Sequence, residues 1–177
     1  MTQPLECSLQ FCPNLSTNLS SSTLLLPSLL PTASPSTSIG EDQFVAIDLC
    51  YSTFDDAVKY CNSIGRELAQ IYSEEENQKA SEVCGNVTNN GSNNWDCWIG
   101  LVEIGGSAST PKSSQNWEWL NGREAIYTNW IIGHPDNDNG IIDSRYGMIS
   151  EVGDENDGKW FDADDSYRSI PLCQLLR

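Results

Sequence analysis

The stretch TFDDAVKYCNSIGRELAQIYSEEEN, residues 53–77, decides the fold class because it holds two predicted helices joined by a short strand. In its first part, apolar residues recur at the i, i+3, i+4, i+7 spacing of a helix with one buried face. These residues are Phe54, Ala57, Val58 and Cys61. Ser52 or Thr53 is the candidate N-cap, and Gly65 ends the helix. The pattern therefore predicts that Cys61 lies on the buried face.

The second part of the stretch predicts a strand and another helix. The segment ELAQIY, residues 67–72, has the character of a short strand. Ser73 and Glu76 have the spacing of a capping box, in which each side chain bonds the backbone N–H of the other residue. We expect the helix that they begin to run to about Cys84.

The segments on either side have the character of strands. FVAIDL, residues 44–49, is apolar enough for a first strand, and WIGLVEI, residues 98–104, predicts another after an Asn/Gly-rich loop. From Trp117 onward, short apolar pieces alternate with Asn, Gly and Asp turns, and the last of them are YGMIS, GKWFD and SIPLCQ. Two helices first and short strands later predict an α+β domain with antiparallel sheet.

The N-terminal part differs in composition. Residues 13–39 are dominated by Ser, Thr, Leu and Pro, which bury little surface and interrupt regular structure. We expect residues 1–40 to be a flexible stalk or linker, a candidate for O-glycosylation, and residues 41–177 to form the domain. The apolar run 24–30 contains Pro27, is too short to span a bilayer and follows no Lys or Arg, so we expect no transmembrane segment and find no clear signal peptide.

The chain is strongly acidic, with 25 acids against 9 bases and a formal net charge of −16. Nucleic acids and anionic membranes both require Lys and Arg, so this charge argues against either as a partner. Half of the net charge lies in residues 134–165, which hold ten acids and two bases. The general interpretation is solubility, whereas the local concentration favours a role for a cation.

Seven cysteines are spread along the chain, and none forms a CxxC pair. The single His cannot complete a Cys/His zinc site, so we expect disulfides formed in an oxidising compartment. Sequons for N-glycosylation begin at Asn14, Asn18, Asn86 and Asn90. We therefore expect a secreted or extracellular glycoprotein.

Six segments in this order resemble the C-type lectin-like domain family: residues 53–77, CWIGL, NWEWLNG, YTNWIIGHPDN, GKWFD and PLCQ. The resemblance covers roughly residues 41–177. It implies an α+β fold with two helices, small antiparallel sheets, a long loop region, and first and last strands that meet. It also implies a disulfide from the first helix to the last strand, between Cys61 and Cys173, and the alternative is two buried free thiols.

The family's second disulfide is absent, because its two cysteines would align near Tyr146 and Asp165. Cys84 and Cys97 flank the Asn/Gly-rich loop, and we expect them to bond to each other instead. Three cysteines are left without an assignment: Cys7, Cys12 and Cys50.

Sugar-binding members of this family hold calcium, which binds two sugar hydroxyls as part of a shell of six to eight oxygens. The family pattern is Glu-Pro-Asn or Gln-Pro-Asp with a typically cis Pro, an acid shortly after, and then Trp-Asn-Asp. Here the corresponding triplets are His134-Pro135-Asp136 and Trp160-Phe161-Asp162. Two departures weaken the correspondence, because imidazole is a poor ligand for a hard cation and Phe161 has no amide oxygen.

By this correspondence the ligand-binding candidates are His134, Asp136, Asn137, Asp143 and Asp162. The metal candidates among them are Asp136, Asp143 and Asp162, with Ser144 as the alternative to Asp143. Other acids that are near in sequence could rebuild a calcium site: Asp138, Asp154, Glu155, Asp157, Asp164 and Asp165. The simpler interpretation of His134 is a solvated loop histidine.

The resulting hypothesis is a carbohydrate-binding domain for a glycan or glycoprotein, with Ca²⁺ as a candidate cofactor. The alternative is a calcium-independent protein-interaction module on the same fold, and ice binding is a third use of the family's fold. We do not expect an enzyme, because the chain has no GxSxG, HExxH or phosphate-loop motif. Four tryptophans are expected in the core: Trp117, Trp119, Trp130 and Trp160.

Overall fold

The computed structural model describes residues 43–47, 51–88, 96–150 and 157–177. The predicted stalk over residues 1–40 stays a prediction, because it lies outside the described residues. The same holds for several residues discussed above: Cys7, Cys12, Cys50, Asn14, Asn18, Asn90, Asp154 and Glu155.

The described part is an α+β domain, as predicted, in which seven strands join in one sheet. The helices are α1 (Phe54–Ser63), α2 (Glu74–Thr88) and the short α3 (Asn137–Gly140), with a 3-10 turn η1 (Lys112–Ser114). The strands are β1 (Phe44–Ala46), β2 (Arg66–Leu68), β3 (Cys97–Glu103), β4 (Trp117–Trp119), β5 (Tyr146–Ile149), β6 (Trp160–Ala163) and β7 (Ile170–Leu175).

Both long helices begin with the caps that their sequences predict. The Thr53 hydroxyl accepts a bond from the backbone N–H of Asp56, and the Ser73 hydroxyl accepts one from that of Glu76. The capping box of α2 is shifted, because the Glu76 carboxylate accepts its bond from the N–H of Tyr72 instead of Ser73 (2.8 Å). The helix α1 ends before Gly65, whose φ of +72° suits glycine.

Strand β7 is the centre of the sheet. It pairs antiparallel with β1 and β2, and Cys173 lies opposite both Val45 and Leu68, so these two strands occupy its two edges. Its beginning also pairs with β3, and this contact is parallel, whereas the sequence predicted antiparallel pairing only in general terms. The difference follows from the long connection between β3 and β7, which lets the chain cross back before it pairs.

Two disulfides join the helices to the sheet, and both predicted pairings are confirmed. Cys61 on α1 bonds Cys173 on β7, with a Cα–Cα distance of 5.5 Å. Cys84 on α2 bonds Cys97 at the start of β3, with a Cα–Cα distance of 6.1 Å. The first and last strands therefore meet at a point that is also covalently closed.

Buried aromatic rings fill the core between the sheet and the long loop. The Trp160 ring lies edge-on to Trp119 and Trp130, with centroid distances of 5.7 and 5.8 Å. Trp117, Trp119 and Trp160 are buried as predicted, whereas Trp130 is only partly buried. The Trp130 ring packs against this core, and it also borders a surface groove.

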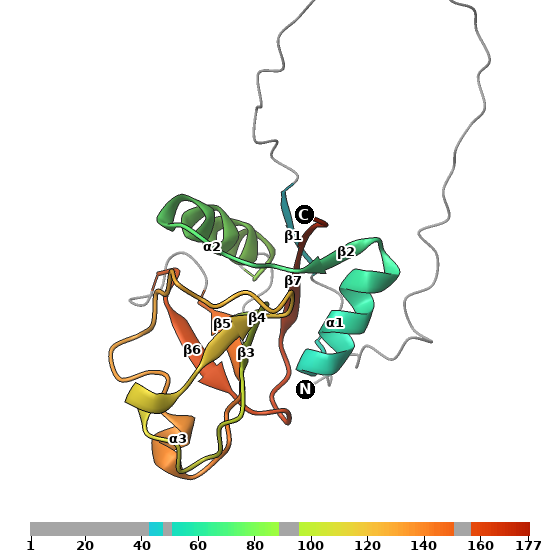
Figure 1. Ribbon diagram of the computed structural model, residues 1–177. Helices are drawn as coiled ribbons and strands as arrows, with labels where there is room; N and C mark the ends of the chain where they lie inside the picture. Colours follow the sequence, from blue (N-terminus) through green and yellow to red (C-terminus); the bar gives the residue numbers. More distant parts are fainter. Residues whose placement is uncertain (1–42, 48–50, 89–95, 151–156) are drawn as a thin grey trace, which may run out of the picture.

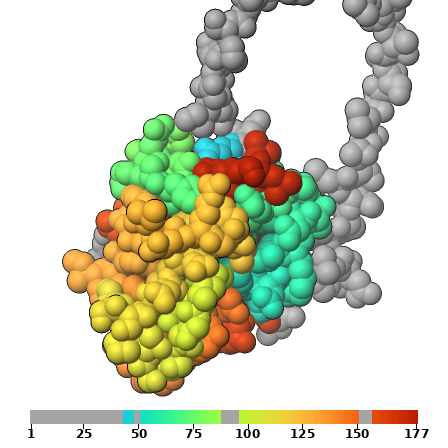
Figure 2. Space-filling view, in the orientation of Figure 1, coloured from blue at the N-terminus to red at the C-terminus, as the bar shows by residue number. Residues whose placement is uncertain are grey.

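The elements are distributed between two ends of the molecule (Figure 1). β1, β2, α2 and the C-terminal end of β7 lie together, while α3 lies at the opposite end. In the space-filling view, yellow and yellow-green atoms form that opposite end, and orange atoms lie between them and the green atoms of α2 (Figure 2). Among the helices of the described residues, none combines the length and the apolar character needed to cross a bilayer.

The two disulfides close loops of different length, so removing each should cost a different free energy of unfolding. The Cys61–Cys173 bond spans 112 residues and the Cys84–Cys97 bond spans 13. We expect Cys61→Ala/Cys173→Ala to lose about 5 kcal/mol and Cys84→Ala/Cys97→Ala to lose about 3 kcal/mol, because a longer loop restricts the unfolded chain more. Urea unfolding of the two double variants measures both values, and the reverse order would contradict this explanation.

Candidate functional site

The candidate site is built on the loop that follows Trp130. The backbone N–H of Ile131 donates to a carbonyl of β6, so the loop begins beside that strand. The His134–Pro135 peptide bond is cis, as the resemblance implied. Three residues then have left-handed backbone conformations, which Asn and Asp adopt more readily than other non-glycine residues: Asn137, Asp138 and Asn139, with φ of 53°, 48° and 57°.

The Asp162 carboxylate holds this loop in place. Its side chain is fully buried on β6, and its Oδ1 lies 2.7 Å from His134 Nδ1. The backbone N–H of Asp136 donates to both carboxylate oxygens (3.0 and 3.1 Å), and that of Asn137 donates to Oδ2 (2.7 Å). A carboxylate only accepts hydrogen bonds, so Nδ1 of His134 carries the proton in this contact. All of the donors to Asp162 thus come from the loop itself.

The Asn137 side chain connects the loop to two other backbone segments. Its Oδ1 accepts a bond from the backbone N–H of Ser144 (2.9 Å), and its Nδ2 donates to the carbonyl of Ser107 (3.3 Å). Both Asn137 and Ser144 are buried. The loop is therefore joined to the segment that follows β3, and Ser144 contributes its backbone and not a ligand oxygen.

Asp143 is also engaged within the protein. Its Oδ2 lies 2.6 Å from Nε of Arg145, and the same guanidinium donates to the carbonyl of Gly106 (2.9 Å). Arg145 thus links the end of the loop to the segment after β3. The acid that the resemblance offers as a metal ligand is therefore paired with a positive charge.

The structure brings together only part of the predicted ligand set. His134, Asp136 and Asp162 each offer an atom within 4.8 Å of the others, and no other group of three metal-binding side chains is this close in the described residues. Asp143 does not belong to this group, and Asn137 contributes its backbone N–H. Three of the predicted residues therefore lie close together, and their polar atoms are engaged in contacts within the protein.

These residues do not fit calcium in the geometry that the resemblance implied. Three donors already contact the two oxygens of Asp162, namely His134 Nδ1 and the backbone N–H groups of Asp136 and Asn137. Arg145 holds Asp143, and Phe161 packs edge-on to the His134 ring at a centroid distance of 6.2 Å. Of the three predicted metal ligands, only the Asp136 carboxylate is left without such a contact, and one carboxylate supplies far fewer than six oxygens.

Glu103, which the sequence analysis missed, is a buried acid beneath this site. It ends β3, is 5% exposed, and has no hydrogen bond to either carboxylate oxygen among the described residues. Its pKa is raised by burial and then by nearby Asp143, while Arg145 opposes the shift. Glu103 is the acid in the apolar strand segment WIGLVEI, and that break in the pattern was the available signal.

A hollow of about 330 Å³ opens beside the loop. Its walls combine aromatic rings with carboxylates and an amide, and carry no Lys or Arg. The lining residues that an incoming ligand would meet are Phe161, Tyr167, Asp136, Asp138, Asn139 and Asp164. Such a mixture offers an apolar face and several hydrogen-bond acceptors to a small polar ligand.

A disulfide-linked α+β domain with a preformed hollow at one end is the architecture of a binding module. The sequence profile described as "Lectin C-type domain" matches residues 51–175. The chain therefore belongs to the C-type lectin domain family, whose members are binding modules rather than enzymes. Calcium binding is frequent in this family, as are disulfides, glycosylation and an extracellular location.

Individual relatives agree with this assignment. A perlucin-like protein from Mytilus galloprovincialis is 32% identical over 85 residues, which are 48% of this chain and 48% of that protein. The chain spans about half or less of the length of the curated relatives it matches.

Solved structures share the fold. The C-type lectin CEL-I from Cucumaria echinata has a TM-score of 0.58 at 22% identity, over 75% of this chain and 89% of that one. Herring type II antifreeze protein has a TM-score of 0.56 at 20% identity, over 76% of this chain and 91% of that one.

Replacing Asp162 by Asn should loosen the loop, because an amide nitrogen would face groups that donate hydrogen bonds. We expect Asp162→Asn to lower the free energy of unfolding by about 1.5–3 kcal/mol, the usual contribution of bonds to a charged group. The amide protons of Asp136 and Asn137 should exchange faster by NMR. Asp138→Asn, with the same charge change at an exposed loop position, is the control and should change neither quantity.

Replacing Glu103 by Gln should make stability less sensitive to pH. Burial raises the folded-state pKa of Glu103 above its ordinary value of 4.5, so the folded state binds the proton more tightly than the unfolded state. The contribution of Glu103 to the free energy of unfolding is therefore fully present below about pH 4.5, and it is lost as pH rises through the folded-state pKa. We expect Glu103→Gln to be more stable than the unchanged chain at pH 7 by about 1–3 kcal/mol.

The two proteins should have nearly equal stability at acidic pH, where Glu103 is protonated in both states. Thermal or urea unfolding at both pH values measures the difference. A difference in stability that is the same at both pH values would show that the buried charge of Glu103 does not cause it.

Proposed function

We propose that this domain binds a carbohydrate in the hollow beside the Pro135 loop, without a calcium ion between protein and sugar. The observation that carries the proposal is the Asp162 carboxylate, which accepts from three donors of the loop itself. In the calcium-dependent design the metal both shapes the loop and contacts the sugar. Here the hydrogen bonds of Asp162 and Arg145 hold the loop in its conformation, so the hollow is preorganised. The contacts with the sugar are then made by side chains.

The side chains of the hollow suit a neutral sugar. The Phe161 ring is partly exposed and offers an apolar face to the C–H groups of a pyranose. Asp136, Asp138 and Asp164 offer oxygens to its hydroxyl groups. With no Lys or Arg lining the hollow, sialylated and sulfated sugars would be repelled by the same carboxylates.

The roles of the predicted site residues change under this proposal. Asp136 contacts the ligand, while His134, Asn137, Asp143 and Asp162 position the loop from within. The relatives support a sugar ligand by name, since they include "Salivary C-type lectin 2" from Aedes albopictus and "Ladderlectin" from Oncorhynchus mykiss. The two disulfides support a secreted or extracellular location, because such bonds persist in oxidising compartments.

A protein ligand is the second candidate. Ile132 and Ile141 are strongly exposed on the same loop, and exposed aliphatic side chains are typical of protein-binding surfaces. The antifreeze protein among the structural relatives shows that this fold also occurs in a protein named for something other than sugar binding.

Glycan-array binding with and without chelator tests the proposal. We expect binding to neutral glycans that survives EDTA and falls at least tenfold, or about 1.4 kcal/mol, in Phe161→Ala, because the stacking face is lost. Leu176→Ala removes an exposed apolar side chain at the other end of the domain and should leave binding unchanged. Binding that disappears in EDTA would contradict the calcium-free mechanism, and no retention of any glycan would reject the sugar ligand.

A further inference from the structure

A second concavity lies on the other side of Pro135. It is a groove of about 410 Å³, and its lining includes Pro135, whereas His134 and Asp136 line the sugar hollow. Trp117 and Trp130 form its middle, with ring centroids 4.8 Å apart. The Pro135 loop therefore separates two concavities, and the proposed sugar site accounts for only one of them.

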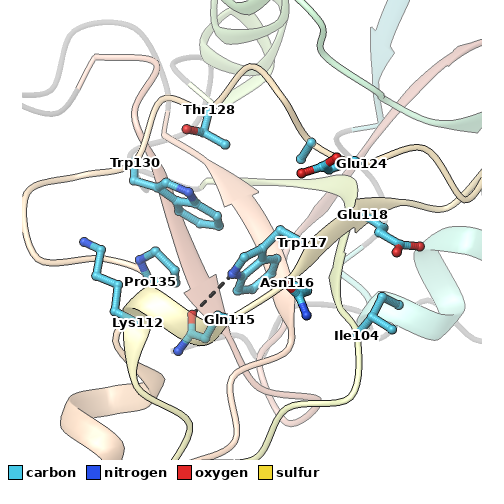
Figure 3. A pocket seen from close by; sticks show the side chains of 11 residues that line it. Ile104, Lys112, Gln115, Asn116, Trp117, Glu118, Glu124, Thr128, Trp130 and Pro135 are labelled. Carbon is cyan, nitrogen blue, oxygen red and sulfur yellow. Dashed lines mark hydrogen bonds between the residues drawn. The ribbon is translucent and has the colours of Figure 1, made fainter.

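The two ends of the groove carry opposite charges. Figure 3 shows Lys112 beside Pro135 at one end, and Glu118 and Glu124 at the other end beyond the tryptophans. Glu118 and Glu124 lie opposite each other in an isolated antiparallel bridge, which places two like charges on neighbouring positions. Like charges directly opposite in a β-bridge repel each other.

Nothing in the described part of the chain neutralises this pair of carboxylates. The ion pairs of the described residues involve other acids, and no hydrogen bond to either the Glu118 or the Glu124 carboxylate occurs there. Two unpaired carboxylates beside two indole rings form a favourable environment for an organic cation. The ring faces attract a cation electrostatically, and carboxylates accept the paired N–H groups of a guanidinium.

Exposed aliphatic residues flank the groove. Ile126 follows the lining residue Ala125, and Ile132 lies two positions beyond Trp130. Their side chains are 89% and 101% exposed. Trp and Arg contribute much of the binding energy at the centre of protein interfaces.

We propose that this groove binds a basic segment of a partner protein, with one Arg or Lys side chain seated between the tryptophans and the Glu118–Glu124 pair. The exposed isoleucines contact apolar residues next to that basic side chain. The net charge of −16 draws such a partner to the domain and disfavours acidic ones. This interaction uses a different surface from the sugar hollow, so it does not depend on the proposed function being correct.

NMR titration of the whole chain with two matched peptides tests the proposal. The probes are acetyl-Leu-Arg-Leu-amide and the same peptide with citrulline, a neutral isostere, in place of arginine. The indole N–H signals of Trp117 and Trp130 report on the groove, and that of buried Trp98 reports that the domain is folded. We expect the arginine peptide to shift the two groove signals with a Kd at least tenfold lower than the citrulline peptide.

The charge-neutral variant Glu118→Gln/Glu124→Gln should lose this tenfold preference. Asp55→Asn/Glu82→Gln makes the same change in net charge on exposed positions of α1 and α2, and it should keep the preference. Equal response to both peptides, no response to either, or a preference that survives the Glu118/Glu124 variant would each overturn the proposal. A response to neutral oligosaccharides alone would assign the groove to a sugar and also overturn it. The peptide comparison on the unchanged chain decides the question even if a variant does not fold.

Discussion

The covalent closure of β7 onto α1 is the constraint on which the rest of this domain depends. Cys173 is the residue where β1, β2 and α1 all meet β7, through two strand pairings and one disulfide. Because β7 also runs beside β3, the same strand joins the helical end of the molecule to the sheet that carries the loop. The segment between β4 and β7, which contains the Pro135 loop, α3, β5 and β6, can then adopt a fixed shape, since both of its ends are held by the sheet.

Within that loop, a second level of organisation comes from buried charge. Asp162 would be costly to bury alone, and it is stable because His134 and two backbone N–H groups surround it. Arg145 does the same for Asp143 and joins it to the segment after β3. Glu103 has no such partner for either carboxylate oxygen among the described residues, so its burial is an energetic cost. The site therefore combines internal neutralisation with one acid that is left uncompensated.

The sequence predicted the parts of the fold that follow from local periodicity and from the family's motifs. The apolar spacing from Phe54 to Cys61 predicts α1, because a helix with one buried face places apolar residues three or four positions apart. Both disulfides and the meeting of the first and last strands were also predictable. The arrangement of the acidic loop was not, because a sequence lists carboxylates without showing which way the neighbouring backbone N–H groups point. Asp162 and His134 are 28 residues apart, and only the folded chain reveals that they contact each other.

The antiparallel pairing of β1 with β7 has a consequence for how the domain is presented. Phe44 lies opposite Gln174, so the polypeptide enters and leaves the domain at neighbouring points. The Pro135 loop lies at the far end, as the separation of α3 from β1 in Figure 1 shows. Whatever joins the domain through either terminus thus leaves its two concavities facing outward. Copies tethered in this way would engage a repetitive target together, and weak single contacts would gain strength from avidity.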